Sequence, residues 1–166
     1  MLVRQRGERV TKSQSEQIRV LRGNHPARID DKGRVKVPNG FRQIVESEYG
    51  PELFVTSVTG EYVRLYPMLV WLEIERKLAA VPGTSPAKQR FLDRVNFFGQ
   101  LVAMDKQGRV LIPQILRESA TMSGEVSVLG LQNHLAVWNQ RRLTERLFEQ
   151  EPFTEEDGRA LAEFGI

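Results

Sequence analysis

Two arginines stand at a spacing that suits the binding of phosphate or of a guanine edge. Arg34 and Arg109 each follow a glycine, Gly33 and Gly108, in the pattern Asp-x-x-Gly-Arg. The aspartate accepts hydrogen bonds from the backbone just ahead and glycine tolerates a positive φ, so the pattern predicts a tight turn. An arginine that leaves such a turn presents a planar fork of donors, which fits phosphate oxygens or O6 and N7 of guanine.

Each turn opens a longer segment that occurs twice in the chain. Residues 30–42 read DDKGRVKVPNGFR, and residues 105–117 read DKQGRVLIPQILR. At a fixed offset of 75 residues six pairs are identical, namely Asp30/Asp105, Gly33/Gly108, Arg34/Arg109, Val35/Val110, Pro38/Pro113 and Arg42/Arg117. Ordinary residue usage gives on the order of one match in such a window. The chain therefore contains an internal duplication.

Basic side chains are more numerous around the first turn than around the second. Lys32, Arg28 and Arg22 lie within or ahead of the first turn, and such side chains can bind phosphates, which gives affinity and register. The second turn has Lys106, with a glutamine at the position equivalent to Lys32. We therefore expect DNA contact mainly from the first copy, led by Arg34, with the second arginine as a secondary contact.

A purely structural role is the alternative for both arginines. Each could pair with the aspartate four residues earlier and so hold the hairpin, and for Arg109 the two roles are equally open. The remaining motif residues are interpreted as turn formers and backbone devices: Asp30, Asp105, Gly33, Gly108, Pro38 and Pro113. Arg42 and Arg117 fall on predicted helices, where contact with strand ends and phosphate binding both remain open.

The elements that position these turns follow from the apolar patterns. Alternation predicts a short strand after each turn, and each proline suits the first position of a short helix. Two hairpins follow, one over residues 53–55 and 62–66 and the other over 126–131 and 135–138. Because one such unit buries little apolar surface alone, we expect the two copies to interleave.

Helices are expected between and after the copies. Trp71, Ile74, Leu78 and Val81 form an apolar stripe at helical spacing, and Ser85-Pro86 begins a second helix. A last helix is predicted over residues 141–149, followed beyond Pro152 by a loose acidic tail. The large aromatic residues on these elements are interpreted as core or subunit interface: Trp71, Phe91, Phe97, Phe98, Trp138 and Phe148.

Composition and charge restrict the function classes. The chain has no cysteine, which excludes disulfides, thiolate chemistry and a cysteine zinc site. His25 and His134 have no partners at metal-ligand spacing, and no catalytic motif occurs, so we expect no enzyme, metal or cofactor. The net charge is +3, but residues 1–23 hold six basic and two acidic residues, which leaves the rest nearly neutral. No apolar segment is long enough for a membrane span or a secretory signal, so we expect a cytoplasmic protein.

With both Asp-x-x-Gly-Arg segments identified, the chain resembles the MraZ family, a two-copy branch of the SpoVT–AbrB group. Leu21-Arg22-Gly23 and Leu65-Tyr66-Pro67 add to the likeness, which runs from about Leu21 past Trp138. It implies a β-rich α+β fold in which two tandem swapped-hairpin units form a pseudo-twofold β-barrel with flanking helices. The expected divisions are a disordered extension (1–20), unit 1 (24–66), a helical connector (67–98), unit 2 (99–142) and a C-terminal helix with an acidic tail (143–166).

The same resemblance implies a DNA-binding transcription regulator associated with the nucleoid. Members of the family assemble into homo-oligomeric rings and bind direct repeats ahead of the division and cell-wall gene cluster, so a repressor is expected. An AbrB-like antitoxin and a protein-binding scaffold ring are the alternatives. Residues 1–20 lie outside the likeness, and a translation start nearer Val20 is one hypothesis for them.

Overall fold

The computed structural model describes residues 19–166, and most of the extension expected over residues 1–20 lies outside this part. The first repeat contributes β1 (Leu21–Arg28), β2 (Arg34–Lys36), α2 (Asn39–Glu48), β3 (Glu52–Thr56) and β4 (Val63–Pro67). The second contributes β5 (Gln100–Ala103), β6 (Arg109–Leu111), α5 (Gln114–Ser119), β7 (Glu125–Gln132) and β8 (Leu135–Asn139). Between them lie α3 (Met68–Ala79) and α4 (Pro86–Phe98), and after them α6 (Gln140–Glu145), η1 (Arg146–Gln150) and α7 (Glu155–Ala162).

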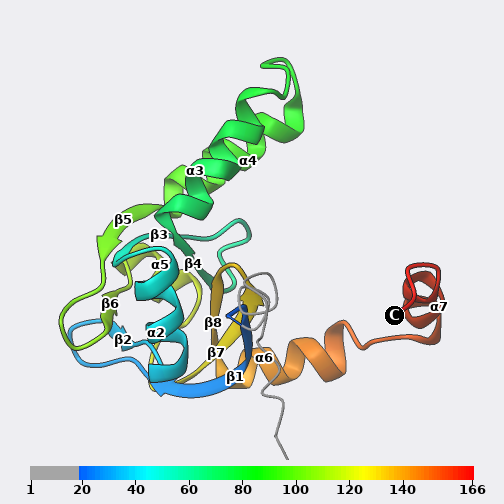
Figure 1. Ribbon diagram of the computed structural model, residues 1–166. Coiled ribbons are helices and arrows are strands. Elements are labelled where there is room, and N and C mark those ends of the chain that lie inside the picture. Colours follow the sequence, from blue (N-terminus) through cyan, green and yellow to red (C-terminus); the bar gives the residue numbers. More distant parts are fainter. Residues whose placement is uncertain (1–18) are drawn as a thin grey trace, which may run out of the picture.

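The strands form one large antiparallel sheet and one short ladder, so the α+β class predicted from the sequence is confirmed (Figure 1). The sheet order is β1-β7-β8-β4-β3-β5, and β2 pairs only with β6. Most ladders cross between the repeats: β1 pairs with β7, β5 with β3, β4 with β8, and β2 with β6. The outer strands of the large sheet, β1 and β5, are not paired with each other, so the described strands form an open sheet and not the closed barrel that the resemblance implies.

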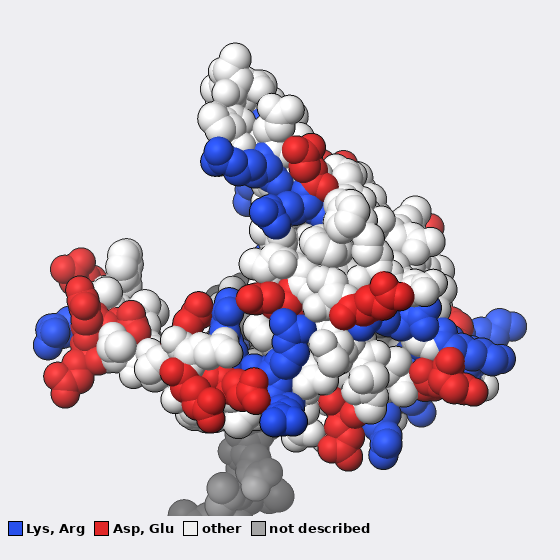
Figure 2. All heavy atoms as spheres, turned by 180° about the vertical axis from the view of Figure 1, so that it is seen from behind, with Lys and Arg blue, Asp and Glu red and all other residues white. Residues whose placement is uncertain are grey.

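Helices α3 and α4 form a hairpin that projects from the body of the molecule (Figures 1 and 2). Ser85 caps α4 by accepting a hydrogen bond from the backbone N of Lys88 at 3.3 Å, as its position before a proline predicts. At the base of the hairpin Trp71 stacks on Phe54, with ring centroids 4.6 Å apart. Of the predicted core or subunit-interface positions, Trp71 lies in the core, whereas Phe97 is 65 % exposed, so for Phe97 the subunit interface stays the prediction.

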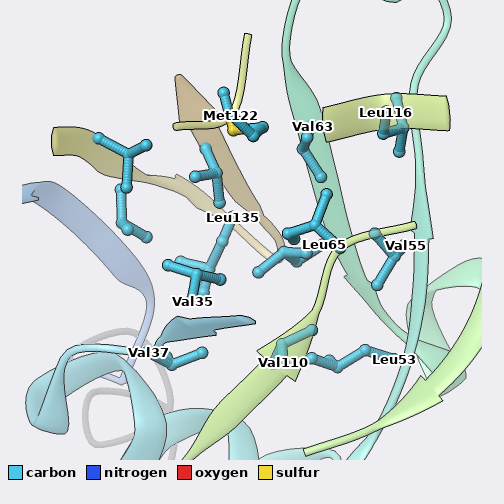
Figure 3. Close-up of a cluster of buried hydrophobic side chains, with 14 of the residues drawn as sticks. Val35, Val37, Leu53, Val55, Val63, Leu65, Val110, Leu116, Met122 and Leu135 are labelled. Carbon is cyan, nitrogen blue, oxygen red and sulfur yellow. The ribbon is translucent and has the colours of Figure 1, made fainter. Parts of the chain in front are cut away.

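The main core is shared by the two repeats (Figure 3). Val35 of β2 lies directly opposite Val110 of β6, and both are fully buried. Leu65 from the first hairpin, and Leu116 and Leu135 from the second repeat, close around them. Because each repeat supplies half of the same apolar interior, neither half has a complete core without the other.

Helices α2 and α5 begin one residue later than the prolines suggest. Pro38 and Pro113 are the residues just before each helix, with φ near −53° and −54° and extended ψ values of 139° and 144°. They are therefore the N-cap residues of the two helices. The sequence prediction that they occupy the first helical position is wrong by one residue. Phe41 and Val45 of α2 are buried against the shared core.

The C-terminal segment is helical where a loose tail was expected. Beyond α6, a π-helical turn (η1) leads to α7, which stands away from the sheet (Figure 1). Thr154 and Asp157 form a capping box, in which the Thr154 hydroxyl accepts from the backbone N of Asp157 and the Asp157 carboxylate accepts from the backbone N of Thr154. The sequence Thr-Glu-Glu-Asp carries this signal. None of the helices within residues 19–166 is both long and apolar enough to cross a bilayer.

The sheet face opposite the core carries stacked aromatic rings around a cation. Tyr62 stacks on Trp138 at 4.4 Å, and Tyr66 stacks on His134 at 4.6 Å. Arg64 donates hydrogen bonds to both tyrosine hydroxyls, at 2.9 Å to Tyr66. Burial, with a further contribution from the charge of Arg64, lowers the pKa of His134 to about 4.

The shared core predicts one cooperative unfolding transition. Leu116→Ala removes a side chain that is fully buried at the junction of both repeats, so the free energy of unfolding should fall by about 2–5 kcal/mol. Ile115→Ala, at a neighbouring position that is 37 % exposed, is the control and should change stability much less. Urea denaturation monitored by tryptophan fluorescence and circular dichroism measures both. Two separate transitions would show that the repeats fold independently.

A pH dependence follows from His134. Its folded pKa of about 4 lies below the ordinary value of 6.5, so the unfolded chain binds the proton more strongly. The stability associated with neutral His134 is therefore present above pH 6.5 and is lost as the pH falls toward 4. His134→Gln should flatten the decrease of the urea midpoint in that range. An unaltered slope in His134→Gln would contradict this assignment.

Candidate nucleic-acid interface

The two repeat turns have the same backbone geometry. Asp30 Oδ1 accepts hydrogen bonds from the backbone N of Lys32 and of Arg34 at 3.0 and 2.9 Å, and Gly33 has φ +79°. In the second turn Asp105 Oδ1 accepts from the backbone N of residues 107 and 109, each at 2.9 Å, and the glycine has φ +77°. A positive φ strains any residue with a Cβ, so glycine is required for this bend.

Each turn arginine is tethered at one edge of its guanidinium. Arg34 Nε donates to Asp30 Oδ2 at 2.8 Å, and Arg109 Nε donates to Asp105 Oδ2 at 2.9 Å. The arginine side chains are 25 % and 30 % exposed, and their terminal nitrogens make no hydrogen bond to any residue of the described chain. The structural pairing and a binding role are therefore compatible, because the aspartate fixes the fork and leaves its outer donors available.

Hydrogen bonding to the turn keeps both aspartates ionised. The pKa of Asp30 is lowered mainly by the hydrogen bond from the backbone N of Arg34; burial opposes this, and the hydrogen bonds from the Arg34 side chain and the backbone N of Lys32 lower the pKa further. Asp105 is stabilised in the same way by Arg109, and its pKa is also lowered. At neutral pH both ion pairs are therefore intact.

The ladder of β2 and β6 gathers cations on one outward surface. Arg34 lies opposite Leu111, and Lys36 lies opposite Arg109. Because side chains alternate along a strand and Val35 points inward, these four residues share the outer side, which we call the ladder face. Lys36 was not among the contact residues predicted from the sequence. Its separation of two residues from Arg34 is the signal that places both side chains on one face of the strand.

The other predicted contacts divide into near and distant groups. Arg28 ends β1 and lines a shallow depression together with Lys36 and Pro38, so it lies beside the ladder face. Arg22 lies six residues before Arg28 on β1, where it pairs with Leu131. Six residues of extended strand separate Arg22 from Arg28 by about 20 Å. The structure therefore brings Arg28 to the turns but does not bring Arg22 there.

Charge is distributed more evenly between the turns than the count of basic residues indicates. Lys32 and Lys106 are both exposed on their turns, but Asp31 is also exposed and offsets Lys32. Arg28 and Lys36 lie toward the Arg109 end of the ladder. Figure 2 shows basic side chains projecting at the edge on the viewer's right, the side of the two turns, with acidic side chains between them.

Each turn is supported by the opposite repeat. The backbone N of Val37 donates to the carbonyl of Gly108 at 2.8 Å, and that of Ile112 donates to the carbonyl of Gly33 at 2.9 Å. A Cβ added at Gly33 would lie 2.5 Å from the guanidinium carbon (Cζ) of Arg117, and one at Gly108 would lie 2.8 Å from Cδ of Arg42. Arg117 of the second repeat thus covers Gly33 of the first, and Arg42 of the first repeat covers Gly108 of the second. The sequence left the role of both arginines open.

This arrangement can bind anions and base edges. The outward donors are guanidinium and ammonium groups on a rigid two-stranded support, which suits phosphate and the acceptor-rich edge of guanine. Within residues 19–166 there is no group of three or more His, Asp or Glu side chains that could hold a metal ion.

Comparison with known proteins gives consistent matches along the chain. A family model described as "MraZ protein, putative antitoxin-like" matches residues 99–164. The chain is 50 % identical over 147 residues to a protein of Acidobacterium capsulatum named "Transcriptional regulator MraZ", covering 89 % of this chain and all of the relative. Proteins with the same name from Koribacter versatilis and Halothermothrix orenii are 48 % and 35 % identical, over 89 % and 87 % of this chain and 100 % and 98 % of theirs. The chain therefore belongs to the MraZ family.

Proposed function

We propose that this protein is a sequence-specific DNA-binding transcription regulator that contacts double-stranded DNA through the ladder face and its two turns. The observation that carries the proposal is the outward side of the β2–β6 ladder, where Arg34, Lys36 and Arg109 stand together. Like charges on directly opposed strand positions destabilise a ladder, and an anionic partner offsets that cost. The name of the relatives, "Transcriptional regulator MraZ", supports the same class of function.

The geometry favours entry of the ladder into the major groove. That groove admits a two-stranded β-ribbon, and an arginine fork binds O6 and N7 of guanine there. Arg34 and Arg109 are the proposed base-reading residues because their turns hold them in fixed directions. Lys32, Lys36 and Arg28 are proposed to contact phosphates, which contribute affinity without sequence preference.

Self-association is part of the proposal because one subunit carries few cations. Large apolar side chains are exposed on α3 and α4, such as Leu69 and Phe97, and on the C-terminal segment, such as Phe153 and Phe164. Exposed apolar side chains that adjoin one another are typical of interaction surfaces. A head-to-tail ring would present its ladder faces in series, which matches direct repeats and multiplies affinity by roughly 10²–10⁴ through effective concentration.

The biological role we infer is repression of the division and cell-wall gene cluster from repeats ahead of the protein's own gene, with association with the nucleoid. We also infer that the strand pairs formed between the two repeats, such as β1 with β7 and β2 with β6, are the swapped hairpins that the family resemblance implies. An antitoxin role is the second candidate, favoured by the wording of the matched family model and by the exposed C-terminal helix. Binding of the upstream DNA fragment in preference to a scrambled fragment separates regulation from both the antitoxin and scaffold roles.

Arg34→Ala and Arg109→Ala should each weaken binding of the upstream fragment by roughly 10- to 100-fold, because each removes a bidentate base contact. Folding should be retained, since exposed ion pairs contribute about 0–1 kcal/mol to stability. Arg76→Ala is the matched control: it removes an arginine from an exposed ion pair on α3 and should leave DNA affinity unchanged. Fluorescence anisotropy and thermal melting measure both properties. Wild-type affinity in both turn variants would reject the ladder face as the interface.

A second prediction concerns assembly. Phe153→Ser combined with Phe164→Ser should reduce the sedimenting mass, because both residues are more than 70 % exposed and present apolar surface that a second subunit could bury. Binding to a fragment with several repeats should weaken far more than binding to a single repeat. A monomeric variant that binds the repeated fragment as tightly as the wild type would contradict the multivalent mechanism.

A further inference from the structure

Arg42 and Arg117 occupy equivalent positions in the two repeats but differ in their partners. Arg42 Nε donates to Glu46 at 2.9 Å, and its Nη2 donates to the carbonyl of Lys106 at 2.7 Å. The residue four positions after Arg117 is Thr121, which offers no carboxylate. Arg117 Nε is buried without a hydrogen-bond partner in the described chain. Arg42 is therefore neutralised within its own helix, whereas Arg117 keeps its full charge.

Arg117 lies against the first turn. Its Cζ, Nη1 and Nε atoms would all come within 2.6 Å of a Cβ added at Gly33. The same turn is tied to the second repeat by the hydrogen bond from the Ile112 backbone N to the Gly33 carbonyl. The uncompensated guanidinium of the second repeat is thus placed against Gly33, the residue before Arg34, which is one of the two proposed base-reading residues.

The two turns differ in net charge, and Arg117 removes that difference. Residues 30–34 contain two aspartates, one lysine and one arginine, and so have no net charge, whereas residues 105–109 have a net charge of +1 from Lys106. Arg117 adds +1 beside the first turn, while the Arg42–Glu46 pair adds nothing beside the second. With Arg117 included, the two turns present equal net charge.

We propose that Arg117 completes the first turn's phosphate-binding site from the opposite repeat, supplying the positive charge that Lys106 supplies to the second turn. This inference rests on the proposed DNA-binding function. Arg117 is half-buried, and of its guanidinium nitrogens Nε is the one enclosed without a partner in the described chain, so a phosphate oxygen at the turn would accept from the two terminal nitrogens. The first binding turn is therefore a composite of both repeats.

The test is the salt dependence of DNA affinity in the full-length protein. Arg117→Gln should reduce affinity about 5- to 10-fold at moderate salt and should lower the slope of log K against log salt by about one, as expected for loss of one phosphate contact. Arg117→Lys retains the charge and should keep the wild-type slope. Arg42→Gln combined with Glu46→Gln is the matched control, because it removes the guanidinium that covers Gly108 but leaves the net charge unchanged. The slope of log K against log salt in this double variant should equal that of the wild type.

The outcomes separate the two proposals. Arg34→Ala and Arg109→Ala are measured in parallel, and if both substitutions leave specific binding intact, the proposed function itself fails. If Arg34→Ala abolishes specific binding while Arg117→Gln keeps the wild-type slope, only the role of Arg117 is overturned. Equal losses of affinity in Arg117→Gln and the Arg42/Glu46 double variant, with an unchanged slope in both, would show a structural role alone and would also overturn it.

Discussion

The antiparallel pairing of β2 with β6 is the contact on which the remaining structure depends. It places Val35 and Val110 against each other at the centre of the apolar interior and aligns the two repeat turns. The backbone bonds from Val37 to Gly108 and from Ile112 to Gly33 extend this ladder into the turns themselves. A small unit that cannot bury enough apolar surface alone is thereby completed by its own duplicate.

The same pairing sets the electrostatics of the ladder face. Each aspartate fixes one edge of its arginine, so the fork is held in place before any partner arrives, and little side-chain entropy is lost on binding. The ion pairs also cancel charge, and Asp31 offsets Lys32, which leaves Lys36, Arg28 and Lys106, together with Arg117 beside the first turn, as the net cations. In the function proposed for this face, a single subunit binds DNA weakly, and specific recognition depends on repeated presentation of the same face.

Much of this could be predicted from the sequence because the signals are local. The turns, the hairpins, the helix beginning at Ser85 and the duplication all follow from residue type and spacing. The cross-repeat ladders could not be predicted in register, because pairing between distant strands leaves no local pattern. For that reason Lys36 was missed and the role of Arg117 was left open: the position of Lys36 is set by the strand opposite, and that of Arg117 by its contact with a glycine of the other repeat. The short helix α7 was missed although its capping box is visible in Thr154 and Asp157.

The central claim is that DNA lies on the ladder face, and site-specific crosslinking tests it most directly. A photoreactive amino acid introduced separately at Lys36, at Lys106 and, for comparison, at Lys77 on α3 would be irradiated with labelled upstream DNA. Crosslinks from positions 36 and 106, and none from position 77, are the predicted result. The account would be contradicted if position 77 on α3 crosslinked while positions 36 and 106 gave no crosslink, although the protein remained bound to the DNA.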